Sequence, residues 1–286
     1  MFRGEHELPL KRWETDGDLV AYRVSAAAPH AAVLLIHGFA THAGRHATKL
    51  HVLAERGIES FAYDLRGHGR SPGPRALVER FDAFVDDSLA MRERVAAAVP
   101  GLPLFLLAES MGGLLAVRSA QRQPEGLAGL VLTAPALAIG DDIPAPLRSF
   151  AKLLGEIAPA LPAGPLDAKA LSRTPGIAES FLSDPLTYHG AVPLRTAAEM
   201  VSHGRAALGA APAWRIPTLI LHGDADRIVP LRGSQRFAAD AVPGSVELHV
   251  VPGGFHEILH DPGGDALFED IADWIDARAQ ALTVAT

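Results

Sequence analysis

Residues 102–123, LPLFLLAESMGGLLAVRSAQRQ, place a serine between an apolar run and a helix-like segment. The run at 102–107 is short and almost entirely apolar, which is typical of a strand buried on both faces of a sheet. Residues 111–123 follow directly and end before Pro124, which cannot continue a helix. The sequence therefore predicts a sharp strand-to-helix turn with Ser110 at its apex, where the hydroxyl is exposed.

The residues around Ser110 suit a catalytic nucleophile. Gly112 and Gly113 let the helix pass close to the strand, and the N-terminus of that helix offers unpaired N–H groups and a positive dipole end. The pattern is G-x-S-x-G except that Ala108 replaces the first glycine, and a small shift can accommodate the extra methyl group. Ser110 could instead be only a helix N-cap. The strand, the serine, the double glycine and the helix together favour the nucleophile.

Strand-like and helix-like segments alternate along most of the chain. The strand-like runs are 19–25, 32–36, 59–63, 102–107, 127–133, 217–221 and 245–251, and the clearest helical patterns are 80–98, 111–123 and 266–282. This alternation predicts an α/β fold with a mostly parallel, doubly wound sheet. Residues 19–25 alternate in polarity and are expected to form an edge strand.

Residues 136–210 interrupt this pattern with eight prolines and no clear strand. An apolar helical stripe is formed by Leu147, Phe150, Leu154, Ile157 and Leu161, with Lys152 and Glu156 opposite. This helix could simply pack on the sheet domain, or it could belong to a mobile cap whose apolar underside faces a substrate. The position of the insert after a strand favours the cap. We therefore expect a core domain at 1–135 and 211–286 and a helical cap at 136–210.

A second turn, HGFA at 37–40, follows the run at 32–36. In a fold of this kind an oxyanion hole forms from two backbone N–H groups, one after the nucleophile and one after an earlier strand. These are the N–H groups of Met111 and Phe39. Alternatively, Gly38 only permits a tight bend.

A carboxylate and a histidine follow two later strands. The sequence HGDADRIVP at 222–230 offers Asp224 and Asp226, either of which could orient an imidazole, while Asp224 could instead shape the turn. The general base must come last in the order serine, acid, histidine. His256, in the glycine-rich loop of PGGFHEILH at 252–260, fits that position better than His260 or the intrastrand His249.

Composition excludes several classes of function. The chain has 286 residues, a net charge of −7 and no cysteine. The negative charge disfavours nucleic acid as a partner, and the lack of cysteine excludes disulfides and thiol nucleophiles. Four histidines are close in sequence but lack a zinc-ligand spacing, so no metal is expected; they are His37, His42, His46 and His51.

Nothing in the sequence indicates a leader or a membrane span. The first ten residues, MFRGEHELPL, carry charges and a proline where a signal peptide needs an apolar run. No stretch reaches about 18 uninterrupted apolar residues. We therefore expect a cytoplasmic protein, peripheral to membranes at most.

The assembled motifs resemble the monoacylglycerol lipase and lysophospholipase group of the α/β-hydrolases. The resembling pieces, which span about residues 30–265, are HG at 37–38 with His42, Gly44 and Arg45, DLRGHGRS at 64–71, ESMGG at 109–113, DPL at 184–186, GDAD at 223–226 and GFH at 254–256. The resemblance implies an α/β-hydrolase fold with a cap. It also favours Asp226 over Asp224, because the acid of that group precedes a short proline-containing run. Ala108 and the bulky Phe39 depart from the usual pattern of the group.

The resemblance also implies a chemistry. Ser110, His256 and Asp226 would hydrolyse a lipophilic monoester, such as a monoacylglycerol, through an acyl-serine, with the oxyanion on the N–H groups of Phe39 and Met111. No cofactor is expected, the partner is a small ester substrate, and the cap could touch a membrane transiently. A lysophospholipase, a general carboxylesterase, a non-hydrolytic enzyme of this fold and a ligand receptor remain alternatives.

Overall fold

One eight-stranded sheet runs through the computed structural model, which describes residues 9–284. Its strands lie in the order β1-β2-β4-β3-β5-β6-β9-β10; β2 is antiparallel to both its neighbours, β1 and β4, and the six strands from β4 to β10 in this order are parallel to one another. Their bounds are β1 Lys11–Trp13, β2 Ala21–Val24, β3 Ala31–Ile36, β4 Ile58–Tyr63, β5 Leu104–Glu109, β6 Gly129–Thr133, β9 Thr218–Gly223 and β10 Val246–Val251. The α/β fold class predicted from the sequence is confirmed.

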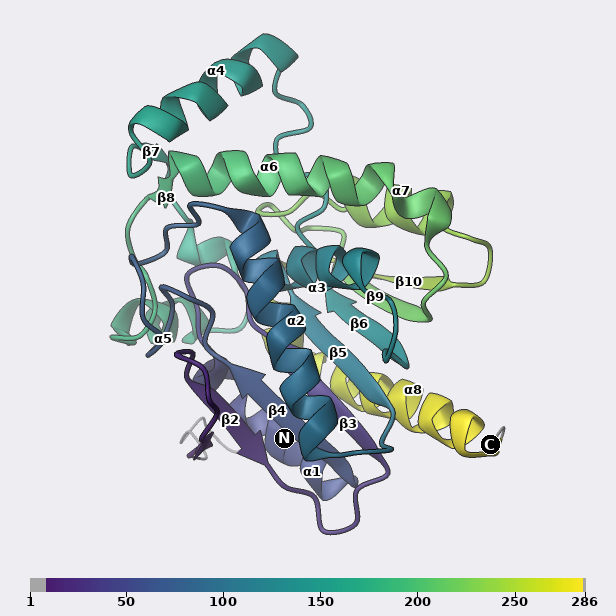
Figure 1. The fold of residues 1–286 in the computed structure, drawn as a ribbon. Helices are drawn as coiled ribbons and strands as arrows, with labels where there is room; N and C mark the ends of the chain where they lie inside the picture. Colours follow the sequence, from purple (N-terminus) through teal and green to yellow (C-terminus); the bar gives the residue numbers. More distant parts are fainter. Residues whose placement is uncertain (1–8, 285–286) are drawn as a thin grey trace.

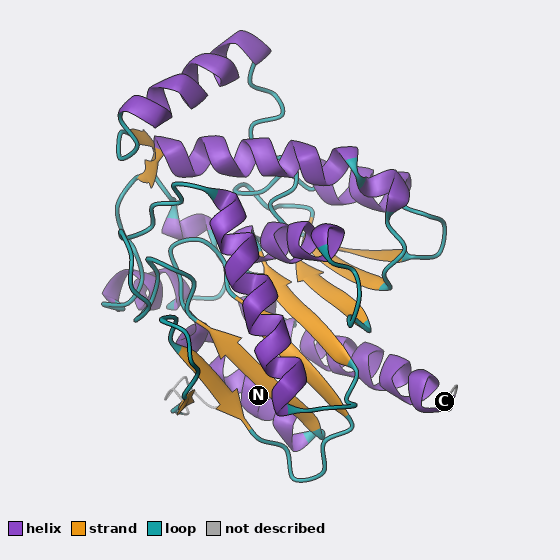
Figure 2. Cartoon of the chain, in the orientation of Figure 1, coloured by secondary structure: helices purple, strands orange, loops and turns teal. Residues whose placement is uncertain are grey.

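Helices cover both faces of this sheet (Figures 1 and 2). The α-helices are α1 Ala47–Glu55, α2 Phe81–Ala98, α3 Met111–Arg122, α4 Ala145–Ile157, α5 Ile177–Ser183, α6 Leu194–Gly209, α7 Arg232–Asp240 and α8 Gly264–Val284, with short 3₁₀ helices at Ala43–His46, Ala168–Ala170, Ala211–Ala213 and Ile258–His260. One buried core unites the sheet with α2, α3, α6 and α7, and a second unites it with α1 and α8.

Strand β3 shows why the central strands read as continuous apolar runs. Leu34 and Ile36 belong to the core on one face, whereas Val33 and Leu35 belong to the core on the other. All four side chains are at most 3% exposed. A strand covered on both faces cannot show the alternation of polarity that a half-exposed strand shows.

The sheet extends one strand further than the sequence indicated. Residues 19–25 were expected at the edge, but β1 pairs outside β2, with Arg12 opposite Tyr22. Strand β1 is only three residues long and largely exposed. Such a segment carries no periodicity that sequence analysis could detect. Residues 1–8, most of the segment considered above for a signal peptide, lie outside the described residues.

Residues 136–210 connect β6 to β9. They contain α4, α5, α6 and a small sheet of β7 (Pro162–Gly164) and β8 (Val192–Pro193), strands too short and too proline-rich to be predicted. Helix α6 packs against α3, and α4 packs on the outer side of α6, away from the sheet (Figure 1).

The apolar stripe of α4 faces outward. Leu147, Phe150 and Ile157 are 56%, 61% and 75% exposed. Exposure does not test the expectation that this stripe faces a substrate, because Leu147, Phe150 and Leu154 also line a groove between α4 and α6; the expectation stays a prediction. Helical periodicity identifies an apolar face, but it does not show what lies against that face.

Helix α3 approaches the end of β3 very closely. A Cβ atom added at Gly112 would overlap the backbone carbonyl oxygens of Ile36 and His37. Position 112 therefore requires glycine, and its close contact sets the distance between the two turns that follow β3 and β5.

Replacing this glycine should cost stability. We expect Gly112→Ala to lower the free energy of unfolding by about 2 kcal/mol, because the extra methyl forces α3 away from β3. Gly209→Ala is the matched control, since nothing lies within 4 Å of its added Cβ and alanine is the better helix former. Urea denaturation measures both variants, and equal stability of Gly112→Ala and the wild type would contradict the argument.

Candidate active site

Ser110 occupies a strained turn between β5 and α3. Its backbone has φ 54° and ψ −119°, which is unfavourable for a residue with a side chain. Three backbone hydrogen bonds hold it there: the Ser110 N–H donates to Thr133 O (2.9 Å), and Ser110 O accepts from the N–H groups of Ala136 (3.0 Å) and Leu114 (3.1 Å). The surrounding structure thus maintains the strain that the serine motif predicts.

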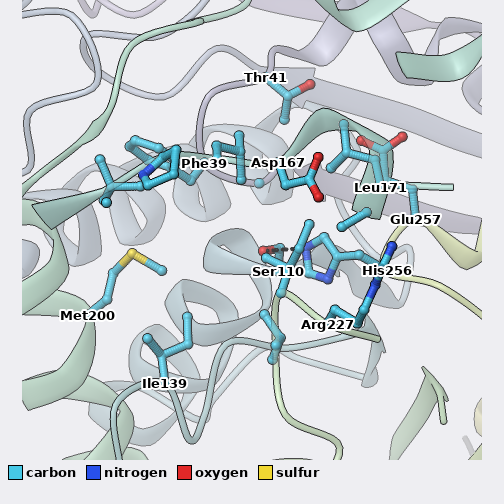
Figure 3. Close-up of a pocket in the computed structure, with 18 of the residues that line it drawn as sticks. Phe39, Thr41, Ser110, Ile139, Asp167, Leu171, Met200, Arg227, His256 and Glu257 are labelled. Carbon is cyan, nitrogen blue, oxygen red and sulfur yellow. Dashed lines mark hydrogen bonds between the residues drawn. The ribbon is translucent and has the colours of Figure 1, made fainter. Parts of the chain in front are cut away.

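His256 connects this serine to a carboxylate. Its Nε2 lies 2.9 Å from Ser110 Oγ (Figure 3), and its Nδ1 lies 2.8 Å from Asp226 Oδ2. Asp226 follows β9, and His256 follows β10. The structure therefore brings together Ser110, His256 and Asp226, which the sequence singled out from segments 146 and 30 positions apart.

The competing residues have other partners. Asp224 accepts a hydrogen bond from the Gly253 N–H at 2.6 Å, so it ties the loop after β9 to the loop after β10. His260 Nδ1 lies 2.9 Å from Glu257 Oε2. His249 is exposed on β10.

The surroundings keep Asp226 anionic and favour a proton on His256. Burial acts to raise the pKa of Asp226, but hydrogen bonds from His222 and His256 outweigh it and hold that pKa below its usual range. Burial acts to lower the pKa of His256, yet the hydrogen bond to Asp226 and the nearby carboxylates raise it overall. An imidazole in this position is suited to accept a proton from Ser110.

The hydrogen bonds of His37 fix the conformation of the turn after β3. His37 Nδ1 lies 2.7 Å from Gly38 O, and His37 Nε2 accepts from the Leu65 N–H at 2.9 Å. Since Nε2 is an acceptor, the ring proton is on Nδ1 and donates to Gly38 O. The C=O and N–H of a trans peptide point in opposite directions, so this bond also fixes the N–H of Phe39.

Gly38 lies beside the nucleophile. A Cβ atom added at Gly38 would lie 3.2 Å from Ser110 Cβ. Met111, the first residue of α3, directly follows Ser110 in the chain. In the described part of the chain, neither Phe39 nor Met111 uses its N–H in a backbone hydrogen bond outside the regular elements.

Two family motifs support the Phe39 loop. Asp64 accepts hydrogen bonds from the N–H groups of Ala43 (2.9 Å) and Arg70 (2.8 Å). Asp184 of the DPL motif lies 2.7 Å from His42 Nε2. The contact of Ala43 ties the loop to the residue that follows β4. The contact of His42 ties it to the 136–210 segment.

Ser110 and His256 line a cavity of about 430 Å³. Its apolar lining is Phe39, Ile139, Leu166, Leu171, Phe181, Val192, Met200, Ile228 and Val229 among others, and its polar lining includes Thr41, Glu109, Asp167 and Glu257. In Figure 3, Met200 and Ile139 lie on one side of Ser110, and Thr41 and Glu257 lie on the other. No α4 residue is part of this lining.

Sequence reasoning missed two carboxyl groups in this lining, Glu109 and Glu257. Burial raises the pKa of Glu109 to about 7, and the charge of Glu257 adds to this effect. Burial also acts to raise the pKa of Glu257, but a hydrogen bond from His260 and the charge of Arg45 lower it overall. Glu109 directly precedes Ser110 and Glu257 directly follows His256. This adjacency was the only sequence signal that the two carboxyl groups lie at the site.

The charge of Glu109 should be visible in the pH dependence of catalysis. Its carboxylate raises the pKa of His256. We therefore expect Glu109→Gln to shift the acid limb of kcat/KM, measured with a p-nitrophenyl ester, to lower pH. The exposed Glu179→Gln serves as control, and an unshifted limb in Glu109→Gln would refute the coupling.

The same variant has a stability signature with a defined sign. The pKa of folded Glu109 is raised to about 7 from 4.5, so the folded state holds this proton more tightly than the unfolded state. Protonated Glu109 therefore contributes to the stability of the folded state; this contribution is fully present below pH 4.5 and is lost as the pH rises through 7. Glu109→Gln should lose less thermal stability than wild type between pH 5 and 8.

Comparison with known proteins places the chain in a family. A family model described as serine aminopeptidase, S33 (Hydrolase_4), matches residues 27–263. A monoacylglycerol lipase of Mycolicibacterium smegmatis is 35% identical over 251 residues, which cover 86% of this chain and 88% of that protein. The human monoglyceride lipase is 30% identical over 254 residues, covering 87% of this chain and 84% of its own length.

A solved structure agrees with these relatives. The monoacylglycerol lipase of Paleococcus ferrophilus superimposes with a TM-score of 0.80 at 30% identity, covering 90% of this chain and 99% of that one. With the strained serine, the histidine and the aspartate in the positions described above, the chain belongs to the serine aminopeptidase S33 family of hydrolases and, within the α/β-hydrolases, to the monoacylglycerol lipase group.

Proposed function

We propose that this protein hydrolyses lipophilic carboxylic monoesters, with monoacylglycerols as its substrate class. The observation that carries this proposal is the hydrogen-bonded series Ser110–His256–Asp226 in a cavity with both apolar and polar walls. The relatives that are named monoacylglycerol lipases support the same assignment.

The mechanism follows from the contacts of these three side chains. Ser110 Oγ attacks the ester carbonyl carbon while His256 Nε2 takes its proton, and the Asp226 carboxylate stabilises the imidazolium. The oxyanion accepts hydrogen bonds from the N–H groups of Phe39 and Met111, each worth on the order of 3 kcal/mol in the transition state. His256 then protonates the leaving alcohol, and water hydrolyses the acyl-serine by the same steps.

The two kinds of wall suit the two parts of a monoacylglycerol. Ile139 and Met200 offer an apolar surface for the acyl chain, and Thr41 and Glu257 offer acceptors and a hydroxyl for the alcohol. We also propose that 136–210 acts as a cap on a core formed by 1–135 and 211–286. Leu166, Leu171 and Phe181 of this segment supply much of the apolar wall.

Removal of the serine hydroxyl tests the proposed function. Ser110→Ala should lower kcat for monoacylglycerol hydrolysis on the order of 10⁶-fold and should abolish labelling by a fluorophosphonate probe. Ser119→Ala, which removes a buried hydroxyl of α3 that does not line the cavity, is the matched control. No labelling of the wild type, or undiminished labelling of Ser110→Ala, would rule out the hydrolase mechanism.

A substrate panel extends this test to the head group. Lysophospholipids carry an anionic phosphate, which the carboxylates of Asp167 and Glu257 in the cavity lining disfavour, since they outnumber the guanidinium of Arg227 there. We expect monoacylglycerol to be hydrolysed faster than lysophosphatidylcholine of the same acyl chain. The reverse order would identify a lysophospholipase, and equal rates with short-chain esters would identify a general carboxylesterase.

We further propose that the exposed stripe of α4 touches a lipid surface while substrate is collected. No helix in residues 9–284 combines the length and apolarity of a membrane span. Leu147, Phe150 and Ile157 form an outward apolar patch, and Arg148 and Lys152 lie on the same helix. Apolar side chains next to cations favour shallow binding to an anionic bilayer surface.

Vesicle binding tests this contact. The double variant Leu147→Ser and Phe150→Ser should reduce co-sedimentation with phosphatidylcholine–phosphatidylglycerol vesicles at least about tenfold, since each substitution removes on the order of 2 kcal/mol of apolar burial. Leu282→Ser, at an exposed leucine of α8, is the control. Absence of vesicle binding by the wild type would contradict the proposed contact of α4 with a lipid surface.

A further inference from the structure

His222, the penultimate residue of β9, has no part in the mechanism proposed above but touches its carboxylate. Its side chain is fully buried, as is that of Asp226. His222 Nε2 lies 3.3 Å from Asp226 Oδ2. This is the same oxygen that lies 2.8 Å from His256 Nδ1. Two imidazole rings therefore converge on one carboxylate oxygen.

The partners of His222 determine where its ring proton lies. Nε2 is 3.1 Å from the backbone oxygen of Val229, and a carbonyl oxygen can only accept. Nε2 therefore carries the proton, which it donates to Val229 O, with Asp226 Oδ2 as a second, longer contact at 3.3 Å. Nδ1 is 2.8 Å from Ser234 Oγ and accepts the hydroxyl proton of that serine. The direction of donation runs from Ser234 through His222 to Asp226.

Asp226 is saturated by donors as a result. Its Oδ1 accepts from the N–H groups of Ile228 (2.7 Å) and Val229 (2.9 Å). Its Oδ2 faces the ring N–H groups of His222 and His256. With both acceptor sites of each oxygen facing a donor, rotation of the carboxylate would break several contacts at once.

We propose that His222 is a positioning residue, whose Nε2–H and fully buried ring hold the Asp226 carboxylate in the plane that receives His256 Nδ1–H. This inference rests on the proposed function, because it assigns a role through Asp226. Without His222, Oδ2 would lose a donor in a site closed to water, and the carboxylate could turn away from His256. A small misplacement of a catalytic group can cost about 10²-fold in rate.

Two substitutions separate this role from a merely structural one. The amide nitrogen of glutamine reaches the position of a histidine Nε2, whereas an asparagine side chain ends near Nδ1. His222→Gln therefore keeps a donor for Asp226, and His222→Asn keeps a polar group only for Ser234. We expect kcat for a p-nitrophenyl ester to fall about 10²-fold in His222→Asn and less than tenfold in His222→Gln, with KM unchanged in both.

A spectroscopic signature complements the kinetics. The proton between His256 Nδ1 and Asp226 should give a far-downfield proton NMR resonance, because it is held between an imidazole and a carboxylate. This resonance should persist in His222→Gln and should shift or broaden in His222→Asn. Circular dichroism establishes that each variant is folded. Equal losses of kcat in the two variants, or wild-type kcat in His222→Asn, would overturn the proposal.

Ser234→Ala keeps the test decisive if either variant at 222 does not fold. It removes the donor to His222 Nδ1 without touching Asp226, while Val229 O still holds the ring proton on Nε2. We therefore expect the downfield resonance to persist in this variant. Its loss in the folded variant would show that the Ser234 hydroxyl, not His222 Nε2–H, holds the carboxylate, and would overturn the proposal. Failure of the proposed function is a separate result. If the wild type hydrolyses the ester and Asp226→Asn does not, the proposed function stands whatever the variants at 222 show.

Discussion

The parallel register of the central strands is the constraint on which the site depends. Ile36 of β3 pairs with Ala108 of β5, and Gly223 of β9 pairs with Val251 of β10. Strands paired in this way end at the same edge of the sheet, so the loops that follow them meet there. Residues distant in sequence then become neighbours without any long-range element designed to join them.

Direct contacts between these loops fix their relative positions more closely than the strand register alone. A Cβ atom at Gly223 would overlap Gly254 O, so the loop carrying Asp226 presses directly on the loop carrying His256. The Gly38 turn also approaches Ser110, though less closely, since a Cβ atom at Gly38 would lie 3.2 Å from Ser110 Cβ. Backbone approaches of this kind fix the relative positions of loops that have no regular structure of their own. They also explain why strain at Ser110 persists, because the neighbouring segments leave the turn no room to relax.

Much of this arrangement follows from local sequence patterns. Strands β3, β5 and β6 read as apolar runs because both their faces are buried, and the serine turn was evident from its strand, its glycines and its helix. The choice of Asp226 over Asp224 came from family resemblance. The structure accounts for it physically, since Asp224 is engaged by Gly253.

Other features depended on packing that no local pattern encodes. The outward orientation of the α4 stripe is set by α6, which already covers the sheet-facing side. The roles of Glu109, Glu257 and His222 depend on burial and on partners far away in sequence. The motif HGDAD contains His222, yet only the fold shows that its ring reaches the carboxylate four residues later.

The division of the cavity between the two parts of the chain has a consequence for specificity. Ser110, His256, Thr41 and Glu257 come from loops of the sheet, and they provide reacting groups and part of the polar wall. Most of the wall that an acyl chain would touch comes from 163–200. That segment is anchored to the sheet side through Asp184 and His42. The length of acyl chain accepted can therefore change through residues of 163–200 while the geometry of proton transfer, which is set by sheet register and loop contacts, stays the same.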